Sequence, residues 1–141
     1  MDNGAKVCIV SKDIEPVNGA AIIKVEDTLK ALQDIARFKR MQYDIPVVAV
    51  TGSVGKTSTK DLIASVVSEG YKTLKTKGNY NNEIGLPLTV LSLKDEETMV
   101  VEMGMNHFGE IRKLTNIAKP TVAVITNIGT CLLYTSDAAD E

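Results

Sequence analysis

The fold is decided by the stretch Val47-Val48-Ala49-Val50-Thr51-Gly52-Ser53-Val54-Gly55-Lys56-Thr57-Ser58-Thr59. A short apolar run leads directly into a glycine-containing loop, and an amphipathic helical pattern follows at once. Glycines let backbone N–H groups turn toward an anion, and the first turn of a helix adds its positive end. The order of strand, loop and helix therefore predicts a loop that binds the phosphates of a nucleoside triphosphate.

Two side chains of this loop carry the expected chemistry. Lys56 can reach the β- and γ-phosphates, and the hydroxyl of Thr57 can hold the Mg²⁺ that bridges them. The strict pattern G-x-x-x-x-G-K-[ST] requires glycine where this chain has Val50, so the loop is a shortened variant. The alternative is a simple glycine turn that happens to precede Lys-Thr, which the spacing and the flanking patterns disfavour.

Composition and charge exclude several classes of protein. The chain has 141 residues, is 44% hydrophobic and 24% charged, and carries a formal net charge of −2. A nucleic-acid-binding protein is expected to carry an excess of positive charge, which this chain lacks. The two cysteines, Cys8 and Cys131, are far apart and are predicted to be reduced thiols. No export signal and no long apolar run is present, so we expect a cytoplasmic protein without a membrane span.

From residue 45 onward, apolar strands alternate with amphipathic helices. The predicted strands are 47–50, 71–76, 98–103 and 121–126. Three helices are predicted: one that follows the glycine loop and ends near residue 70, one over 87–93 and one over 109–118. The expected apolar face of the first helix consists of Leu62, Ile63, Val66 and Val67, and that of the third consists of Ile111, Leu114 and Ile117. This alternation predicts an α/β fold of the P-loop type, with a mostly parallel sheet covered by helices on both faces.

The region before residue 45 is predicted to be different. Two short strands, 6–10 and 20–25, precede a helix that Asp27 caps and that runs to about Met41. Its expected apolar face consists of Leu29, Leu32, Ile35, Ala36 and the segment 38–39. Arg37, Lys39 and Arg40 are interpreted as a solvated helix end, where positive charge suits the helix dipole. The segment 44–46 is interpreted as a domain boundary.

Polar residues gather where the predicted parallel strands end, which is where such sheets bind ligands. Glu102 follows an apolar strand, and a buried carboxylate there needs a partner such as Mg²⁺. We therefore expect Glu102 and Thr57 to face each other and share a hydrated ion. His107 is either a phosphate or metal contact or an ordinary loop residue. The Asn-rich segment 78–85 suits polar substrate groups, but is also common turn chemistry.

Three segments resemble the Mur ligase family. The loop Thr51–Thr57 is similar to the T-G-[ST]-x-G-K-[TS] loop of Mur ligases and folylpolyglutamate synthetases. The segment 77–89 resembles the G-N-x-N-N-x-I-G-x-P-L-T segment of the branch of this family that adds D-alanyl-D-alanine. The segment 102–111 resembles the E-[LM]-G-x-N-H-x-G-E-I segment of the same branch, where sister ligases differ.

The resemblance implies an ATP-dependent carboxylate–amine ligase of peptidoglycan synthesis, and hence of cell-wall biogenesis, cell shape and cell division. Such an enzyme joins D-alanyl-D-alanine to UDP-N-acetylmuramoyl-tripeptide through an acyl phosphate. The implied cofactors are ATP and Mg²⁺, the full-length enzyme is expected to be a monomer, and neither nucleic acid nor a membrane is an expected partner.

The resemblance also implies roles for particular residues. The implied catalytic residues are Lys56, Glu102 and His107, and the implied metal ligands are Thr57 and Glu102. The expected ATP-binding residues are Gly52, Ser53, Val54, Gly55, Lys56, Thr57, Ser58 and Asn127, and the expected substrate-binding residues are Asn79, Asn81 and Asn82.

The resemblance covers about residues 25–130. It implies that residues 1–44 are a remnant of an N-terminal uridine-nucleotide-binding domain with a connecting helix, and that 45–130 are part of the central ATP-binding domain. After the fourth strand the family continues with T-N-x-G-x-A-H-x-E, whereas residues 131–141 depart from this pattern and place Leu132 at the histidine. We interpret the chain as an internal fragment with a foreign tail, which alone should not ligate and should self-associate through its uncovered fourth strand.

Two other interpretations are weighed against this one. A GTPase-like switch would need a guanine-reading N-K-x-D segment, and the sequence contains none. The chain is alternatively an inert remnant without activity.

Overall fold

A computed structural model describes residues 5–15 and 19–129. The expected tail at 131–141, with Cys131 and Leu132, lies outside the described residues. The elements in chain order are β1 (Val7–Val10), β2 (Ala21–Lys24), α1 (Thr28–Arg40), β3 (Val47–Thr51), α2 (Lys56–Ser68), β4 (Thr73–Lys75), α3 (Gly85–Leu91), β5 (Thr98–Glu102), α4 (Glu110–Ala118) and β6 (Val122–Ile125). None of the described helices is long and apolar enough to cross a membrane.

The main sheet has four parallel strands in the order β4-β5-β3-β6. The central strand β3 pairs with β5 on one side, where Val50 lies opposite Glu102, and with β6 on the other, where Thr51 lies opposite Ile125. All five residues of β5 are buried. Every strand pair of this sheet is parallel, so the prediction of a mostly parallel sheet is confirmed.

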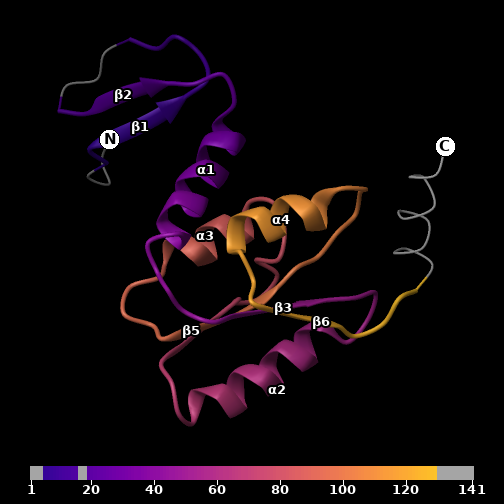
Figure 1. The fold of residues 1–141 in the computed structure, drawn as a ribbon. Coiled ribbons are helices and arrows are strands. Elements are labelled where there is room, and N and C mark those ends of the chain that lie inside the picture. Colours follow the sequence, from indigo (N-terminus) through magenta and orange to yellow (C-terminus); the bar gives the residue numbers. More distant parts are fainter. Residues whose placement is uncertain (1–4, 16–18, 130–141) are drawn as a thin grey trace.

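Helices cover both faces of this sheet, as predicted (Figure 1). One face carries α3 and α4, and together they enclose the core formed by Ala36, Val47, Ala49, Leu86, Val90, Leu93, Met99, Val101, Met103, Leu114, Ile117 and Ala118. The other face carries α2. Side chains alternate along a strand, so Glu102 points to the opposite face from Val101 and Met103, toward α2.

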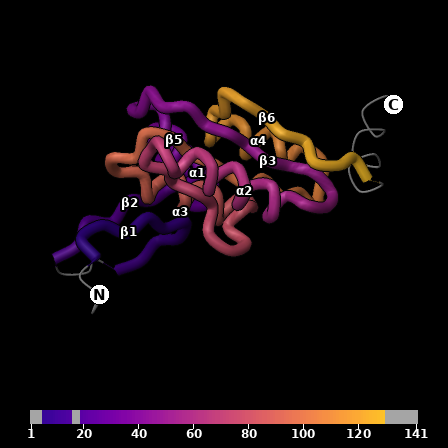
Figure 2. Tube along the Cα trace, turned by 90° about the horizontal axis from the view of Figure 1, so that it is seen from below, coloured from indigo at the N-terminus to yellow at the C-terminus, as the bar shows by residue number. Residues whose placement is uncertain are grey.

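The two short N-terminal strands form a separate parallel pair, with Val7 opposite Ala21. This pair lies beyond one end of α1, at the opposite end of the molecule from the end of β6 (Figures 1 and 2). The expected cap of α1 is confirmed, because Asp27 Oδ1 accepts hydrogen bonds from the backbone N–H groups of Leu29 and Lys30 at 2.8 and 3.0 Å. α1 packs against α3 and α4 rather than standing alone.

The prediction for the C-terminal end of α1 is wrong at Arg40. Arg40 is buried, with 5% of its surface exposed. Its guanidinium donates from Nε to the carbonyl of Ala118 at 2.8 Å, from Nη1 to that of Tyr43 at 2.6 Å and from Nη2 to that of Ile45 at 3.0 Å. The carbonyl of Ala118 belongs to the last turn of α4, where a helix leaves acceptors without intrahelical partners, and those of Tyr43 and Ile45 lie in the loop after α1. Arg40 is therefore a buried structural residue that joins α1 to the end of α4 and to the following loop, and not a solvated charge.

The expected apolar face of α1 is also only partly correct. Ala36 is fully buried, whereas Ile35 and Phe38 are 43% and 68% exposed. Lys39 is half-buried and donates to the carbonyl of Leu91 at 2.8 Å. The face toward α3 and α4 thus runs through Ala36 and Arg40, so charged side chains take positions that the apolar pattern gave to hydrophobic ones.

The predicted apolar face of α2 is wrong for two of its members. Leu62 and Val66 are 69% and 74% exposed, whereas Lys60 and Ala64 are buried against the sheet. A charged residue in a sheet-facing position shifts the buried stripe away from the one that hydrophobicity alone predicts. In α4 the expected face is confirmed, since Leu114 and Ile117 are buried.

Helix α3 begins at Gly85, two residues before the predicted start at Pro87. The side chain of Asn82 accepts hydrogen bonds from the N–H groups of Ile84 and Gly85 at 3.1 and 2.8 Å and so satisfies donors at the helix start. A Cβ at position 85 would lie 2.4 Å from the Cα of Tyr80, so this close approach requires glycine. The turn chemistry of the Asn-rich loop therefore sets the helix boundary.

Candidate functional site

The glycine loop joins the end of β3 to the start of α2 at the carboxyl edge of the sheet. Gly52 has φ +139° and Gly55 has φ +79°, values that side chains other than hydrogen rarely allow. A Cβ on Gly52 would lie 2.2 Å from Thr126 Oγ1. Val50, where the strict pattern has glycine, is a fully buried residue of β3. The loop therefore begins after Thr51, the last residue of β3, and not at position 50.

The segment after β6 holds the loop in shape. The Ser53 N–H donates to the carbonyl of Asn127 at 3.0 Å, and the Gly129 N–H donates to Ser53 Oγ at 2.9 Å. The Thr126 hydroxyl donates to the carbonyl of Val54. The predicted ATP-binding residue Asn127 thus lies beside the loop, through its backbone.

Lys56 and Thr57 open helix α2, as the sequence predicts. Lys56 Nζ donates to the carbonyl of Gly52 at 2.7 Å, which keeps the ammonium over the loop. The site is a cavity of about 400 Å³ lined by Ser53, Val54, Gly55, Lys56, Thr57, Ser58, Asn81 and Glu102. This cavity therefore brings together the loop residues, Asn81 and Glu102.

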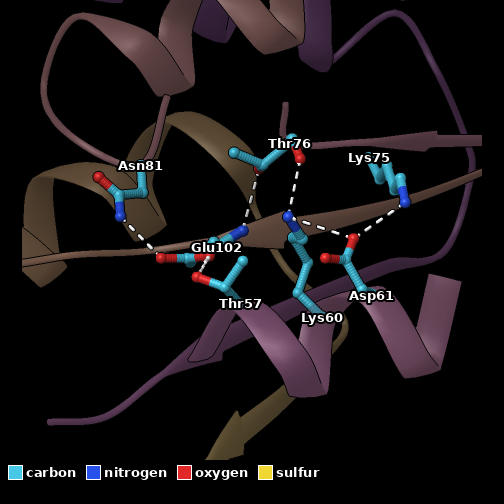
Figure 3. Close-up of polar contacts among 7 residues, drawn as sticks. All are labelled: Thr57, Lys60, Asp61, Lys75, Thr76, Asn81 and Glu102. Carbon is cyan, nitrogen blue, oxygen red and sulfur yellow. Dashed lines mark hydrogen bonds and ion pairs between the residues drawn. The ribbon is translucent and has the colours of Figure 1, made fainter. Parts of the chain in front are cut away.

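Glu102 and Thr57 face each other, as expected. Thr57 Oγ1 donates to Glu102 Oε2 at 2.9 Å, and Asn81 Nδ2 donates to Glu102 Oε1 at 2.7 Å (Figure 3). Glu102 is only 2% exposed. Among the described residues, no lysine, arginine or histidine forms an ion pair with it. Both oxygens of this buried carboxylate accept from neutral donors, and each keeps a lone pair available to a cation.

The oxygen atoms at this place fit Mg²⁺ bound together with phosphate. Mg²⁺ prefers oxygen ligands and is usually held by one or two carboxylates, substrate phosphates and water. Within residues 5–15 and 19–129, no group of three or more His, Cys, Asp and Glu residues could hold a metal ion alone. Thr57 and Glu102 are therefore suited to a metal that arrives with a nucleotide, not to a closed protein cage.

A buried lysine beside this pair was missed by the sequence reasoning. Lys60 is 2% exposed, and its Nζ donates to the carbonyl of Thr76 at 3.0 Å. Thr76, fully buried just after β4, accepts a hydrogen bond from the Glu102 N–H through its Oγ1 at 3.0 Å. Figure 3 shows Thr57 and Lys60 projecting from α2 toward Glu102 and Thr76. A lone lysine in a helix gives no signal of burial in the sequence.

The three predicted substrate-binding asparagines have different surroundings. Asn81 is half-buried against Glu102, whereas Asn82 uses its side chain at the start of α3. Asn79 is exposed, and its carbonyl accepts from the Asn81 N–H at 2.8 Å. Their role toward a substrate stays a prediction, to which the structure adds a local role for two of them.

His107 is exposed in the loop between β5 and α4 and does not line the cavity of the glycine loop. The neighbouring Glu110 accepts a hydrogen bond from the Asn106 N–H at 2.6 Å. This backbone donor is the main cause that lowers the pKa of Glu110 below its ordinary value of 4.5, against a smaller opposing effect of burial. The catalytic role of His107 stays a prediction.

Comparison with known proteins supplies the family. Residues 50–131 match the family model described as the Mur ligase middle domain. A relative named UDP-N-acetylmuramoyl-tripeptide–D-alanyl-D-alanine ligase from Synechocystis sp. (strain PCC 6803) is 48% identical over 129 residues, which are 90% of this chain and 28% of the relative. The ligase of the same name from Bacillus subtilis (strain 168) is 50% identical over 115 residues, which are 81% of this chain and 25% of the relative.

Solved structures agree with these matches. A crystal structure of MurF from Acinetobacter baumannii superposes with a TM-score of 0.85 at 42% identity, covering 92% of this chain and 28% of the other. A crystal structure of MurF ligase from Thermotoga maritima in complex with ADP gives a TM-score of 0.82 at 40% identity, covering 92% and 30%. The chain thus spans less than a third of the length of these relatives.

Proposed function

Since this chain belongs to the Mur ligase family, we propose that it carries the nucleotide-binding part of an ATP-dependent ligase that joins D-alanyl-D-alanine to UDP-N-acetylmuramoyl-tripeptide. The contact between the Thr57 hydroxyl and the buried Glu102 carboxylate, at the mouth of the glycine loop, carries this proposal. The names of the relatives and the ADP complex of the Thermotoga maritima MurF support it.

In the proposed reaction, the tripeptide carboxylate attacks the γ-phosphorus of ATP, and ADP leaves. The amine of D-alanyl-D-alanine then displaces phosphate from the acyl phosphate and forms the amide. The loop N–H groups and the ammonium of Lys56 would bind the phosphates and neutralise their charge. Thr57 and Glu102 would hold Mg²⁺, which supplies Lewis-acid stabilisation of the phosphoryl oxygens when bound.

The remaining expectations belong to the same proposal. Asn79, Asn81 and Asn82 would contact the substrate, and His107 would act near the transferred group. Residues 1–44 would belong to a uridine-nucleotide-binding domain with its connecting helix, and the separation of the β1–β2 pair from the main sheet supports this division. The full-length enzyme would be a monomer acting in the cytoplasm, where ATP and UDP-linked precursors are available.

Isothermal titration calorimetry of ATP in Mg²⁺ tests the proposal on this chain. Lys56→Ala should abolish most of the binding, because the lysine supplies a charged contact to the phosphates. Lys30→Ala is the matched control, since Lys30 also lies in the first turn of a helix but is exposed and far from the loop. Equal affinities of the wild type and Lys56→Ala would contradict the proposed phosphate site.

A second measurement concerns the metal. Glu102→Gln should leave ATP binding without Mg²⁺ intact and remove the gain in affinity that Mg²⁺ gives, because an amide is a poor ligand for this ion. The 141 residues alone should bind ATP without forming an amide, since they span only 28% of the Synechocystis relative. Amide formation by this chain with all three substrates would refute that last expectation.

A further inference from the structure

The starting point is the burial of the Lys60 ammonium. Only 2% of Lys60 is exposed, and burying a charged amine is costly unless it is paired or hydrogen-bonded. Its carboxylate neighbour, Asp61 Oδ1, is 3.4 Å away, half exposed and shared with Lys75 at 2.9 Å. The strong contact of Lys60 is instead the uncharged carbonyl of Thr76 at 3.0 Å. The main hydrogen bond of this buried lysine is therefore to one backbone acceptor, the carbonyl of Thr76.

That acceptor belongs to the ladder between β4 and β5. Lys75 lies opposite Val100, and the Thr76 N–H donates to the carbonyl of Val100 at 3.1 Å. In this parallel register, the next hydrogen bond would run from the Glu102 N–H to the carbonyl of Thr76. The Glu102 N–H donates instead to Thr76 Oγ1 at 3.0 Å, and the Thr76 carbonyl accepts from Lys60 Nζ. Lys60 thus contacts β4 at the point where the regular ladder ends, next to the residue that carries the site carboxylate.

Helix α2 makes both contacts from one face. Residues three apart in a helix are neighbours on its surface, so Thr57 and Lys60 point the same way. Thr57 contacts the Glu102 carboxylate, and Lys60 contacts Thr76, which holds the Glu102 backbone (Figure 3). Backbone and side chain of Glu102 are both tied to the helix that begins with the phosphate-binding loop.

We propose that Lys60 is a positioning residue for the metal-binding pair Thr57–Glu102, acting through Thr76. This inference rests on the proposed function, in which that pair holds the Mg²⁺ of ATP. Lys60 touches neither the metal nor the nucleotide. Its role is to fix the distance between the strand that carries the carboxylate and the helix that carries the hydroxyl.

The test measures ATP affinity of the chain with and without Mg²⁺. Lys60→Met removes the charge and the donor but keeps a long side chain, and it should reduce the gain in affinity given by Mg²⁺ about 10-fold, as partners of metal ligands commonly do. ATP binding without Mg²⁺ should not change, because the loop and Lys56 are untouched. Lys75→Met is the matched control. Lys75 is exposed and is the second lysine that contacts the Asp61 carboxylate, so its removal should change the ATP affinity neither with nor without Mg²⁺.

Thr76 provides the second pair of variants, in case Lys60→Met does not fold. Thr76→Val removes the hydroxyl at nearly constant volume and should lower the Mg²⁺ gain, whereas Thr76→Ser keeps the hydroxyl and should restore it. An equal loss of affinity with and without Mg²⁺ in these variants, or an unchanged Mg²⁺ gain, would overturn the positioning role. Absence of any ATP binding by the wild type would refute the proposed function and, with it, this inference.

Discussion

Replacing Arg40 with methionine should destabilise the fold, although the residue lies far from the glycine loop. Its guanidinium donates to three backbone carbonyls at 2.6, 2.8 and 3.0 Å, and these come from the segment after α1 and from the end of α4. Methionine fills similar space but offers no donor. The substitution would leave the carbonyl of Ala118, at a buried helix end, without its partner.

The magnitude follows from the contacts. A buried acceptor that loses its hydrogen-bond partner costs about 1–3 kcal/mol. Ala118 is fully buried, whereas Tyr43 and Ile45 are half-buried and regain part of their hydrogen bonding from water. The full cost at Ala118 and a smaller cost at the other two give a net loss in unfolding free energy of about 3 kcal/mol.

Urea denaturation followed by circular dichroism measures this loss. At a slope of about 2 kcal/mol per molar urea, the midpoint should fall by roughly 1.5 M. Arg37→Met is the matched control, because Arg37 is exposed one turn earlier in α1, and it should change stability by less than about 0.5 kcal/mol. A midpoint of Arg40→Met equal to that of the wild type, or a fall of equal size in Arg37→Met, would refute the reasoning.

Three further changes test other parts of the molecule. Gly52→Ala should cost about 2 kcal/mol of stability and weaken ATP binding, because its Cβ would meet Thr126 Oγ1 and its φ suits only glycine; denaturation and calorimetry measure both. The lowered pKa of Glu110 gives stability that is present above pH 4.5 and is lost as the pH falls through the folded-state pKa, so Glu110→Gln should destabilise at neutral pH and not in strong acid. Val122→Lys places a charge on the edge strand β6, where Val122 is 52% exposed, and should reduce self-association in sedimentation velocity; unchanged association would exclude this edge as its cause.

Local patterns were sufficient to predict the sheet and the centre of the site. The β3–loop–α2 unit, the Asp27 cap and the parallel strands each depend on residues close in sequence, and the structure confirms them. The contact between Thr57 and Glu102 was also predictable, because the carboxyl ends of parallel strands meet at one edge. These predictions required no knowledge of side-chain packing.

The burial of two cations was not predictable in the same way. Arg40 and Lys60 are buried because packing leaves particular backbone carbonyls without partners, at a helix end and at the end of a strand ladder. Which carbonyls remain free depends on the relative placement of elements distant in sequence. Hydrophobic periodicity therefore assigned their helix faces incorrectly: it placed Phe38 and Val66 on the buried faces, whereas the structure leaves both exposed.

The dependence of the glycine loop on the segment after β6 sets an order of events during synthesis. The Gly129 N–H donates a hydrogen bond to Ser53 Oγ, and the two residues are 76 positions apart in the sequence. At about 5–20 residues per second, a ribosome makes the second partner roughly 4–15 s after the first. Until then β3 lacks its neighbour β6, and the loop lacks the contacts that shape it. The loop therefore reaches the shape that we propose binds phosphate only after nearly all of the described chain has been translated.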